Sequence, residues 1–341
     1  MKKSLMTLGV LALFVLMAYG QEKKFALYSV AFYNMENLFD TIHDEGKNDY
    51  EYLPNGTNQW NTMKYKAKLK NMSEILSMLS TDKLPMGPAI IGVSEIENYR
   101  VLEDILKQPA LADRGYQYVH YEGADQRGVD CAFFYNPKLF ELTNSKLVPY
   151  VYINDTVHKT RGFLIASGNI AGEKMHFIVN HWPSRAAASP VRERAGEQVR
   201  AIKDSLLRED SAAKIVIMGD MNDDPMDKSM AVALGAKRKP VDAGPTDLYN
   251  PWWDTLKKGY GTLMYKGKWN LFDQIVFTGN LLGTDRSTLK FYKHEIFRRD
   301  FMFQKEGKYK GYPKRTQAGG VWLNGYSDHL PTIIYLIKEV K

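Results

Sequence analysis

The sequence predicts one α+β domain in which two stacked β-sheets carry helices on their outer faces. Short apolar runs rich in valine, isoleucine and aromatic residues recur along the chain, and each has the length of a strand. Two longer segments have the length and pattern of helices. No internal repeat and no low-complexity linker divides the 341 residues, so one domain is the simplest organisation.

The first twenty residues are typical of a secretory signal rather than of a folded domain. Two lysines open the chain, Leu5–Met17 is almost wholly apolar, and small residues ending at Gly20 offer a cleavage site. The apolar run is too short for a membrane anchor, and no later stretch is apolar enough to span a bilayer. We therefore expect an exported protein, periplasmic or secreted, whose single domain covers residues 21–341.

The composition excludes a disordered chain and a disulfide-rich scaffold. Apolar residues make up 44% and charged residues 25%, as in soluble globular domains. Removing the two lysines of residues 1–20 lowers the formal charge from +7 to +5, a mild basic bias compatible with a phosphate-bearing substrate. Cys131 is the single cysteine, and its apolar neighbours indicate a buried structural thiol.

In the first half of the chain, predicted strands alternate with helices. Phe25–Tyr33 is rich in aromatic residues and predicts a strand, whereas the polar segment Asp40–Asn61 indicates a surface loop. Apolar residues recur every three or four positions in Thr62–Ser80, which predicts an amphipathic helix. The apolar run Ala89–Val93 predicts a second buried strand. A short helix is expected at Val101–Leu106, with strands at Tyr116–Tyr121 and Val129–Tyr135.

The second half continues the strand pattern around one long helix. Ser189–Arg208 is charged and helical, with Pro190 well placed in its first turn. Ile215–Met218 is a buried strand, while Ala243–Trp269 and Phe291–Gln317 are expected to be surface insertions. The remaining strands are expected at Leu147–Ile153, Phe163–Ile170, Met175–Val179, Leu271–Thr278 and Leu330–Ile337.

Polar side chains follow or end the buried strands at six separate places. They are Asn34, Glu95, His181, Asp220 with Asn222, Asp273, and Asp328 with His329. Residues two apart on an extended chain point the same way, so Asp220 and Asn222 can face one pocket. Oxygen ligands dominate and thiols are absent from this set, which favours Mg²⁺, Mn²⁺ or Ca²⁺ over zinc or copper. A carboxylate inside the strand at Asp273 needs a partner, and His329 is the obvious one.

This ordered set resembles the metal-dependent endonuclease/exonuclease/phosphatase family, in particular its deoxyribonuclease-like branch, as an exported bacterial-type member. The resemblance covers nearly the whole chain after residue 20. It rests on Asn34, Ser94-Glu95, Asn180-His181, Gly219-Asp-Met-Asn222, Asp273 and Ser327-Asp-His329. It implies a four-layer α/β/β/α sandwich of two mainly antiparallel sheets, with the active site at one edge of both.

The resemblance also implies roles for individual residues. Glu95, Asn34 and Asp328 would hold the metal ion, with Mg²⁺ preferred and Mn²⁺ or Ca²⁺ as alternatives. Asp220 and Asn222 would orient the attacking water and a phosphate oxygen. His329 would contact the scissile phosphate, with Asp273 as its orienting carboxylate, and His181 would be a second catalytic histidine.

Three further residues, Asp130, Arg127 and Arg185, complete the predicted site. Asp130 is expected to orient His181, and Arg127 and Arg185 are expected to bind the substrate together with Asn34 and Asn222. Ser94 departs from the glutamine that the family often has before its metal-binding glutamate. Glu97, two residues beyond Glu95, adds an acid of unassigned role.

These residues predict hydrolysis of a phosphodiester in DNA or RNA, by in-line attack of an activated water. A phosphatase or phosphodiesterase acting on a small molecule or lipid headgroup, such as inositol phosphate or sphingomyelin, is an alternative. A non-catalytic binding protein on the same fold is a second alternative. We infer no obligate protein partner. Trp252, Trp253 and the basic segment Lys305–Arg315 are interpreted as packing residues and a solvated loop.

Overall fold

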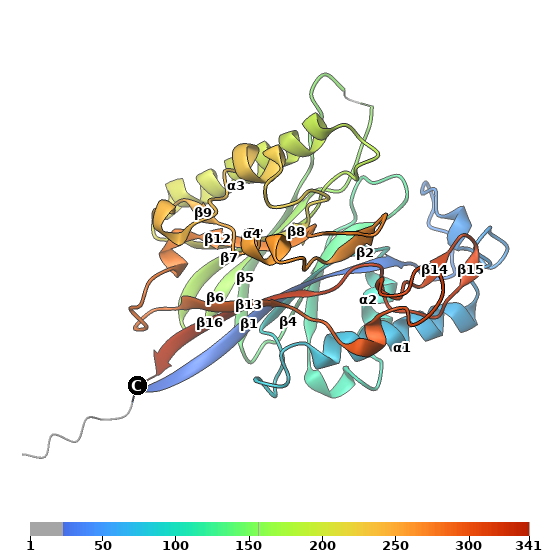
Figure 1. Cartoon of the computed structure of the whole chain (residues 1–341), viewed down its shortest axis with the longest axis horizontal. Coiled ribbons are helices and arrows are strands. Elements are labelled where there is room, and N and C mark those ends of the chain that lie inside the picture. Colours follow the sequence, from blue (N-terminus) through green and yellow to red (C-terminus); the bar gives the residue numbers. More distant parts are fainter. Residues whose placement is uncertain (1–22, 156, 341) are drawn as a thin grey trace, which may run out of the picture.

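A computed structural model describes residues 23–155 and 157–340, so the predicted signal segment 1–20 lies outside the described residues. Two six-stranded sheets form the centre of the fold, in the orders β13-β16-β1-β2-β4-β3 and β5-β6-β7-β8-β12-β9 (Figure 1). The first sheet comprises β1 (Lys24–Leu38), β2 (Ile90–Ile96), β3 (Gln117–His120), β4 (Asp130–Tyr135), β13 (Lys290–Ile296) and β16 (Thr332–Val340). The second comprises β5 (Phe140–Val148), β6 (Phe163–Ile170), β7 (Glu173–His181), β8 (Lys214–Asp220), β9 (Leu248–Tyr249) and β12 (Asp273–Thr278).

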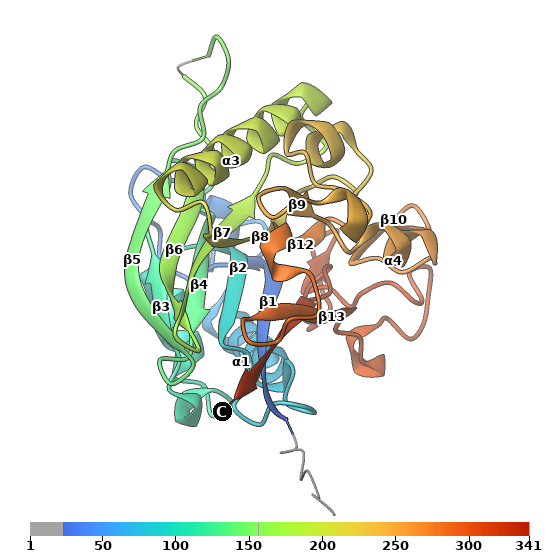
Figure 2. The same cartoon turned by 90° about the vertical axis from the view of Figure 1, so that its left-hand side faces the viewer.

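Helices cover the outer face of each sheet, which confirms the predicted four-layer α/β/β/α sandwich. Figure 2 shows α3 (Ser189–Glu209) above the second sheet and α1 (Thr62–Met78) below the first. The apolar residues of α1 that recur at helical spacing, such as Leu69 and Met72, are buried against the first sheet. Helix α2 (Tyr99–Leu106) joins the same layer. No helix among the described residues is long and apolar enough to cross a membrane.

The two sheets pack face to face through a core of large apolar side chains. Val30 and Phe32 from β1 meet Val216 and Met218 from β8 in one buried cluster. Burying each such side chain stabilises the fold by roughly 1.5–3 kcal/mol. This packing fixes the distance between the sheets, and so also fixes the distance between the polar residues at their edges.

Each sheet is antiparallel except for one central parallel pair, β1 with β2 and β7 with β8. Parallel neighbours need a crossover, which α1 supplies in the first sheet and α3 in the second. The ends of β7 and β8 therefore coincide, and His181 pairs in register with Asp220. The antiparallel strand β12 places Asp273 beside Asp220 on the other side. Three predicted site residues thus form one row across three strands.

Several segments differ from the sequence predictions. The strand expected at Leu147–Ile153 is instead β5, Phe140–Val148, an edge strand whose mixed exposed and buried residues hide its pattern. Phe291–Gln317 was expected to be a surface insertion, but Lys290–Ile296 adds strand β13 to the edge of the first sheet. Short elements also lie within or next to the predicted loops: α4 (Trp253–Lys257), β10 (Leu263–Tyr265), β11 (Lys268–Asn270), β14 (Gln317–Ala318) and β15 (Val321–Trp322).

Gly219 lies inside β8 rather than ending it. The neighbouring strand β7 leaves no room for a side chain at this position. A Cβ added there would lie 2.3 Å from the carbonyl oxygen of Asn180 in β7. A contact with a backbone atom cannot be relieved by moving a side chain. The glycine therefore permits the close pairing that aligns His181 with Asp220.

We expect Gly219→Ala to lower the free energy of unfolding by about 1–3 kcal/mol, because the backbones of β7 and β8 must separate. Urea unfolding followed by circular dichroism measures this loss. In the control Gly244→Ala, the new Cβ would meet only the end of the Asp247 side chain, 3.3 Å away, and stability should hardly change. Equal losses in the two variants would contradict the steric explanation.

Candidate active site

The amide of Asn34 joins the two sheets at the edge where the predicted site residues gather. Its Nδ2 donates to Glu95 Oε1 at 3.1 Å and to Asp220 Oδ2 at 3.0 Å. Its Oδ1 accepts a hydrogen bond from the backbone N–H of Glu36 at 2.8 Å. Asn34 is fully buried, so its orientation is fixed by these contacts. One side chain of the first sheet thus brings a carboxylate from each sheet to the same point.

Glu95 reaches this point because the backbone of β2 is irregular there. The register between β2 and β4 shifts between Ser94 and Ile96, and Glu95 adopts a φ of 58°. A non-glycine residue in this region is strained and persists only when its surroundings hold it. The backbone N–H of Asn37 donates to Glu95 Oε2 at 3.0 Å and supplies part of that restraint.

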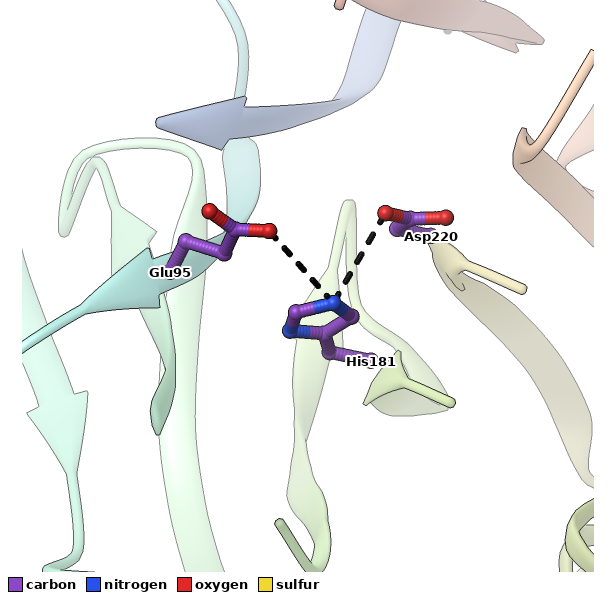
Figure 3. A group of neighbouring side chains, drawn as sticks. All are labelled: Glu95, His181 and Asp220. Atoms are coloured by element: carbon purple, nitrogen blue, oxygen red, sulfur yellow. Dashed lines mark ion pairs between the residues drawn. The ribbon is translucent and has the colours of Figure 1, made fainter. Parts of the chain in front are cut away.

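Glu95, His181 and Asp220 form a compact group of potential metal ligands. Figure 3 shows the two carboxylates flanking one nitrogen of the His181 ring, with Nε2 at 3.6 Å from Glu95 and 3.7 Å from Asp220. One ligand atom from each residue lies within 4.8 Å of the others. Two carboxylates this close repel each other unless a cation or proton lies between them. The group therefore fits a divalent cation.

Burial and crowding raise the pKa of Asp220 to about 7. Burial removes the water that would stabilise the carboxylate, and the neighbouring charges of Asp273 and Glu95 add to the effect. Burial also lowers the pKa of His181 well below its ordinary value, and the cations of Arg161 and Arg127 lower it further. His181 is therefore neutral at neutral pH, the form in which an imidazole can bind a metal ion.

His329 has the opposite charge state, because it is paired with Asp273. Its Nδ1 lies 2.7 Å from Asp273 Oδ2, and both side chains are buried. Burial alone would lower the pKa of His329, but the carboxylates of Asp273 and Asp220 raise it well above its ordinary value. The other nitrogen, Nε2, lies 3.8 Å from Asp220 Oδ2. The site therefore holds a charged His329 and a neutral His181 around the same carboxylate.

Asn222 and Asp328 complete the set of predicted residues at this edge. The backbone N–H of Asn222 donates to Asp220 Oδ1 at 2.9 Å, and its side chain donates to the carbonyl of Trp182. Asp328 Oδ1 lies 3.9 Å from His329 Nε2, and its other oxygen is 2.9 Å from Arg315. The structure thus gathers eight of the predicted residues: Asn34, Glu95, His181, Asp220, Asn222, Asp273, Asp328 and His329.

Asp130 does not contact His181, in contrast to the predicted pairing. Its Oδ2 lies 3.2 Å from His120 Nε2 and accepts the backbone N–H of Gly123 at 3.0 Å. The Nδ1 atom of His181 has no hydrogen-bond partner among the described residues. The physical reason is that Asp130, at the start of β4, and His120, at the end of β3, lie on paired neighbouring strands.

The two predicted substrate-binding arginines have different surroundings. Arg185 lies 3.3, 3.2 and 2.7 Å from the carboxylates of Asp223, Asp224 and Asp227, so its charge is already balanced by protein groups. Arg127 is 47% exposed and lies 3.9 Å from Asp125. Of the two, Arg127 is better placed to meet an anionic ligand.

A charge network that the sequence did not reveal adjoins the site, with Glu36 and Lys68 buried and Arg315 partly exposed. Arg315 Nε donates to Glu36 Oε1 at 2.8 Å and also contacts Asp328. Lys68, fully buried on α1, lies 3.8 Å from Glu36 and donates to Thr316 Oγ1 at 2.5 Å. A role for Glu36 in the site could have been suspected from its place in Asn34-Met-Glu-Asn37, next to the predicted residue Asn34. Lys68 lies on a predicted helix and Arg315 in a predicted basic loop, and both positions suggest solvent exposure.

The profile of the Endonuclease/Exonuclease/phosphatase family matches residues 29–338. Among solved structures, a protein of this family from Bacteroides thetaiotaomicron is 14% identical, with 93% of this chain and 97% of that chain covered and a TM-score of 0.57. D. rerio TDP2 complexed with a single-strand DNA product is 15% identical, with coverage of 91% and 99% and a TM-score of 0.53. A mannosyl-6-phosphatase from Bacteroides thetaiotaomicron is 14% identical, with coverage of 91% and 99% and a TM-score of 0.56. None of the curated protein sequences matches this chain.

The buried carboxyl of Glu97 should make the free energy of unfolding depend on pH. It is 2% exposed, and burial together with the charge of Asp40 raises its pKa to about 9 from an ordinary value of 4.5. Between these two values the folded protein binds more protons than the unfolded chain, so stability should fall as pH rises from 4.5 to 9. One group contributes at most about 1.4 kcal/mol per pH unit.

We therefore expect Glu97→Gln to flatten the fall in the free energy of unfolding between pH 5 and 9, measured in EDTA by urea unfolding at about six pH values. The exposed Glu209→Gln serves as the matched control and should follow the wild-type curve. Parallel curves for wild type and Glu97→Gln would show that Glu97 titrates normally.

Proposed function

Because the chain belongs to the endonuclease/exonuclease/phosphatase family, whose members are phosphoesterases, we propose that it hydrolyses phosphodiesters of DNA or RNA with a divalent cation. One observation carries the proposal. A cluster of potential metal ligands, Glu95, His181 and Asp220, lies directly beside the buried pair of Asp273 and His329. A binding protein has no need of a charged histidine and a neutral histidine around one carboxylate.

The cation would be held by Glu95, with Asp220 and His181 close enough to join it. When bound, it would withdraw charge from a phosphate oxygen and stabilise the leaving oxygen. Asn34 directs its amide nitrogen toward the carboxylates, so we propose that it orients them rather than binding the ion itself. Asp328 remains a proposed ligand of the same centre. Mg²⁺ is the proposed ion, with Mn²⁺ or Ca²⁺ as alternatives.

The remaining groups have distinct tasks in the proposed reaction. His329, held in its charged form by Asp273, donates a hydrogen bond to the phosphate and balances its developing charge. Asp220 and Asn222 orient the attacking water. A second catalytic histidine could protonate the leaving oxygen, but the lowered pKa of His181 suits it to accept a hydrogen bond rather than to release a proton.

We also propose that residues 1–20 are removed on export and that residues 21–341 form one domain. The match of a single family profile to residues 29–338 supports the single domain. The N-terminal sequence of the exported protein would test the cleavage near Gly20.

We expect Glu95→Gln and His329→Gln each to lower the hydrolysis rate about 100-fold or more, because each removes charge that acts on the transition state. The measurement uses Mg²⁺ and a panel of plasmid DNA, single strands, RNA, bis-p-nitrophenyl phosphate, inositol phosphates and sphingomyelin. Circular dichroism confirms folding, and the exposed Glu209→Gln is the control.

Full activity in both folded variants would contradict the proposed mechanism. Hydrolysis of inositol phosphates or sphingomyelin alone would replace the nuclease with a phosphatase or phosphodiesterase for small molecules or lipids. A wild-type protein that neither binds a divalent cation nor hydrolyses any member of the panel would support the non-catalytic binding protein.

A further inference from the structure

A cavity of about 1080 Å³ opens directly beside the candidate site. Glu36, Asn37, Arg315 and Asp328 line the end that adjoins the catalytic residues. Its volume is slightly above the range of about 300–1,000 Å³ for pockets that bind small organic molecules. The cavity can therefore hold a bulky group attached to the phosphate that is cleaved.

Two inserted segments, which lie mostly within the predicted surface segments Ala243–Trp269 and Phe291–Gln317, form the outer wall of this cavity. One is the hairpin of β10 and β11, and the other is the segment 304–323. The backbone N–H of Gly267 in the hairpin donates to the hydroxyl of Tyr312 at 2.6 Å, which ties the two segments together. The wall is therefore one surface rather than two independent loops.

Each segment of the wall carries an exposed tyrosine with a lysine next to it. Tyr265 is 62% exposed and Tyr309 is 52% exposed, although both line the cavity. Lys266 Nζ lies 5.3 Å from the centre of the Tyr265 ring, and Lys308 Nζ lies 5.5 Å from that of Tyr309. Exposed aromatic rings beside cations are the elements with which proteins bind single-stranded nucleic acids.

Four acids and three basic residues line the first cavity, whereas the hollow beside it is mainly basic. A second hollow shares Gln304 with the first and is lined by Arg298, Arg299, Lys305 and Lys310, with Asp300 as its single acid. Arg299 lies 2.6 Å from the carboxylate of Asp82, so Arg298 and the two lysines are the cations that can attract a ligand. Cationic side chains along a groove attract successive phosphates of a strand. A ligand with one phosphate would leave this second hollow unused, so the arrangement favours a polyanion.

We propose that this cavity takes an unpaired nucleotide next to the scissile phosphate, so that the substrate is single-stranded nucleic acid. The substrate class rests on the proposed function. The base stacks on Tyr265 or Tyr309, and neighbouring phosphates lie near Lys266 and Lys308. Bases in a duplex are stacked on each other and cannot enter without unpairing, so a duplex binds more weakly.

Binding can be measured without hydrolysis, by fluorescence anisotropy of a labelled single-stranded oligonucleotide in EDTA. We expect the wild-type protein to bind it at least about tenfold more tightly than a duplex or an abasic strand of equal length. At least one of the variants Tyr265→Ala and Tyr309→Ala should weaken binding of the base-bearing strand about tenfold, and neither should change binding of the abasic strand. Tyr292→Ala is the matched control, since this tyrosine is 52% exposed on β13 and does not line the cavity.

The double variant Lys266→Gln, Lys308→Gln tests the phosphate contacts independently of stacking. It should lower the slope of log affinity against log salt by about 1.4 for a single strand. Equal binding of base-bearing and abasic strands, or unchanged binding in both tyrosine variants, would overturn the inference. The hydrolysis panel tests the proposed function separately, because a protein that cleaves phosphodiesters without this preference would refute only the cavity assignment.

Discussion

The hydrogen bonds from Asn34 to Glu95 and Asp220 hold a partly buried and a buried carboxylate together at the edge shared by the two sheets. Like charges at this distance are unfavourable in a buried setting, and an apolar core cannot compensate for them. The protein meets this constraint by surrounding the pair with donors: the amide of Asn34, the backbone N–H groups of Asn37 and Asn222, and the imidazolium of His329. A divalent cation would complete that compensation.

The strands themselves provide the precision that such a site needs. His181, Asp220 and Asp273 lie in one row because β7, β8 and β12 pair in register, and Gly219 permits the close approach of two of these strands. Groups carried by paired strands are more precisely placed than groups on loops. The strained backbone at Glu95 shows that the first sheet must depart from regular geometry to deliver its carboxylate to the same point.

Much of this arrangement could be predicted from the sequence, because burying a polar side chain at the end of an apolar strand is costly unless it has a partner or a ligand. The pairing of Asp273 with His329 is an example, since a buried carboxylate in a strand requires a partner. The sequence could not show that Asp130 contacts His120 rather than His181, because that contact depends on which strands are neighbours. Edge strands β5 and β13 escaped prediction because mixed exposure weakens the alternating pattern. Lys68 and Arg315 escaped it because the burial of Lys68 and the ion pairs of Arg315 arise only from tertiary packing.

Crystals grown with Mn²⁺ would test the proposed metal centre most directly, since the ion can be located by its anomalous scattering. We expect one peak within about 2.0–2.6 Å of a Glu95 carboxylate oxygen, on the side that faces Asp220 and His181. A peak elsewhere on the molecule, with none at Glu95 under saturating Mn²⁺, would contradict the proposed centre.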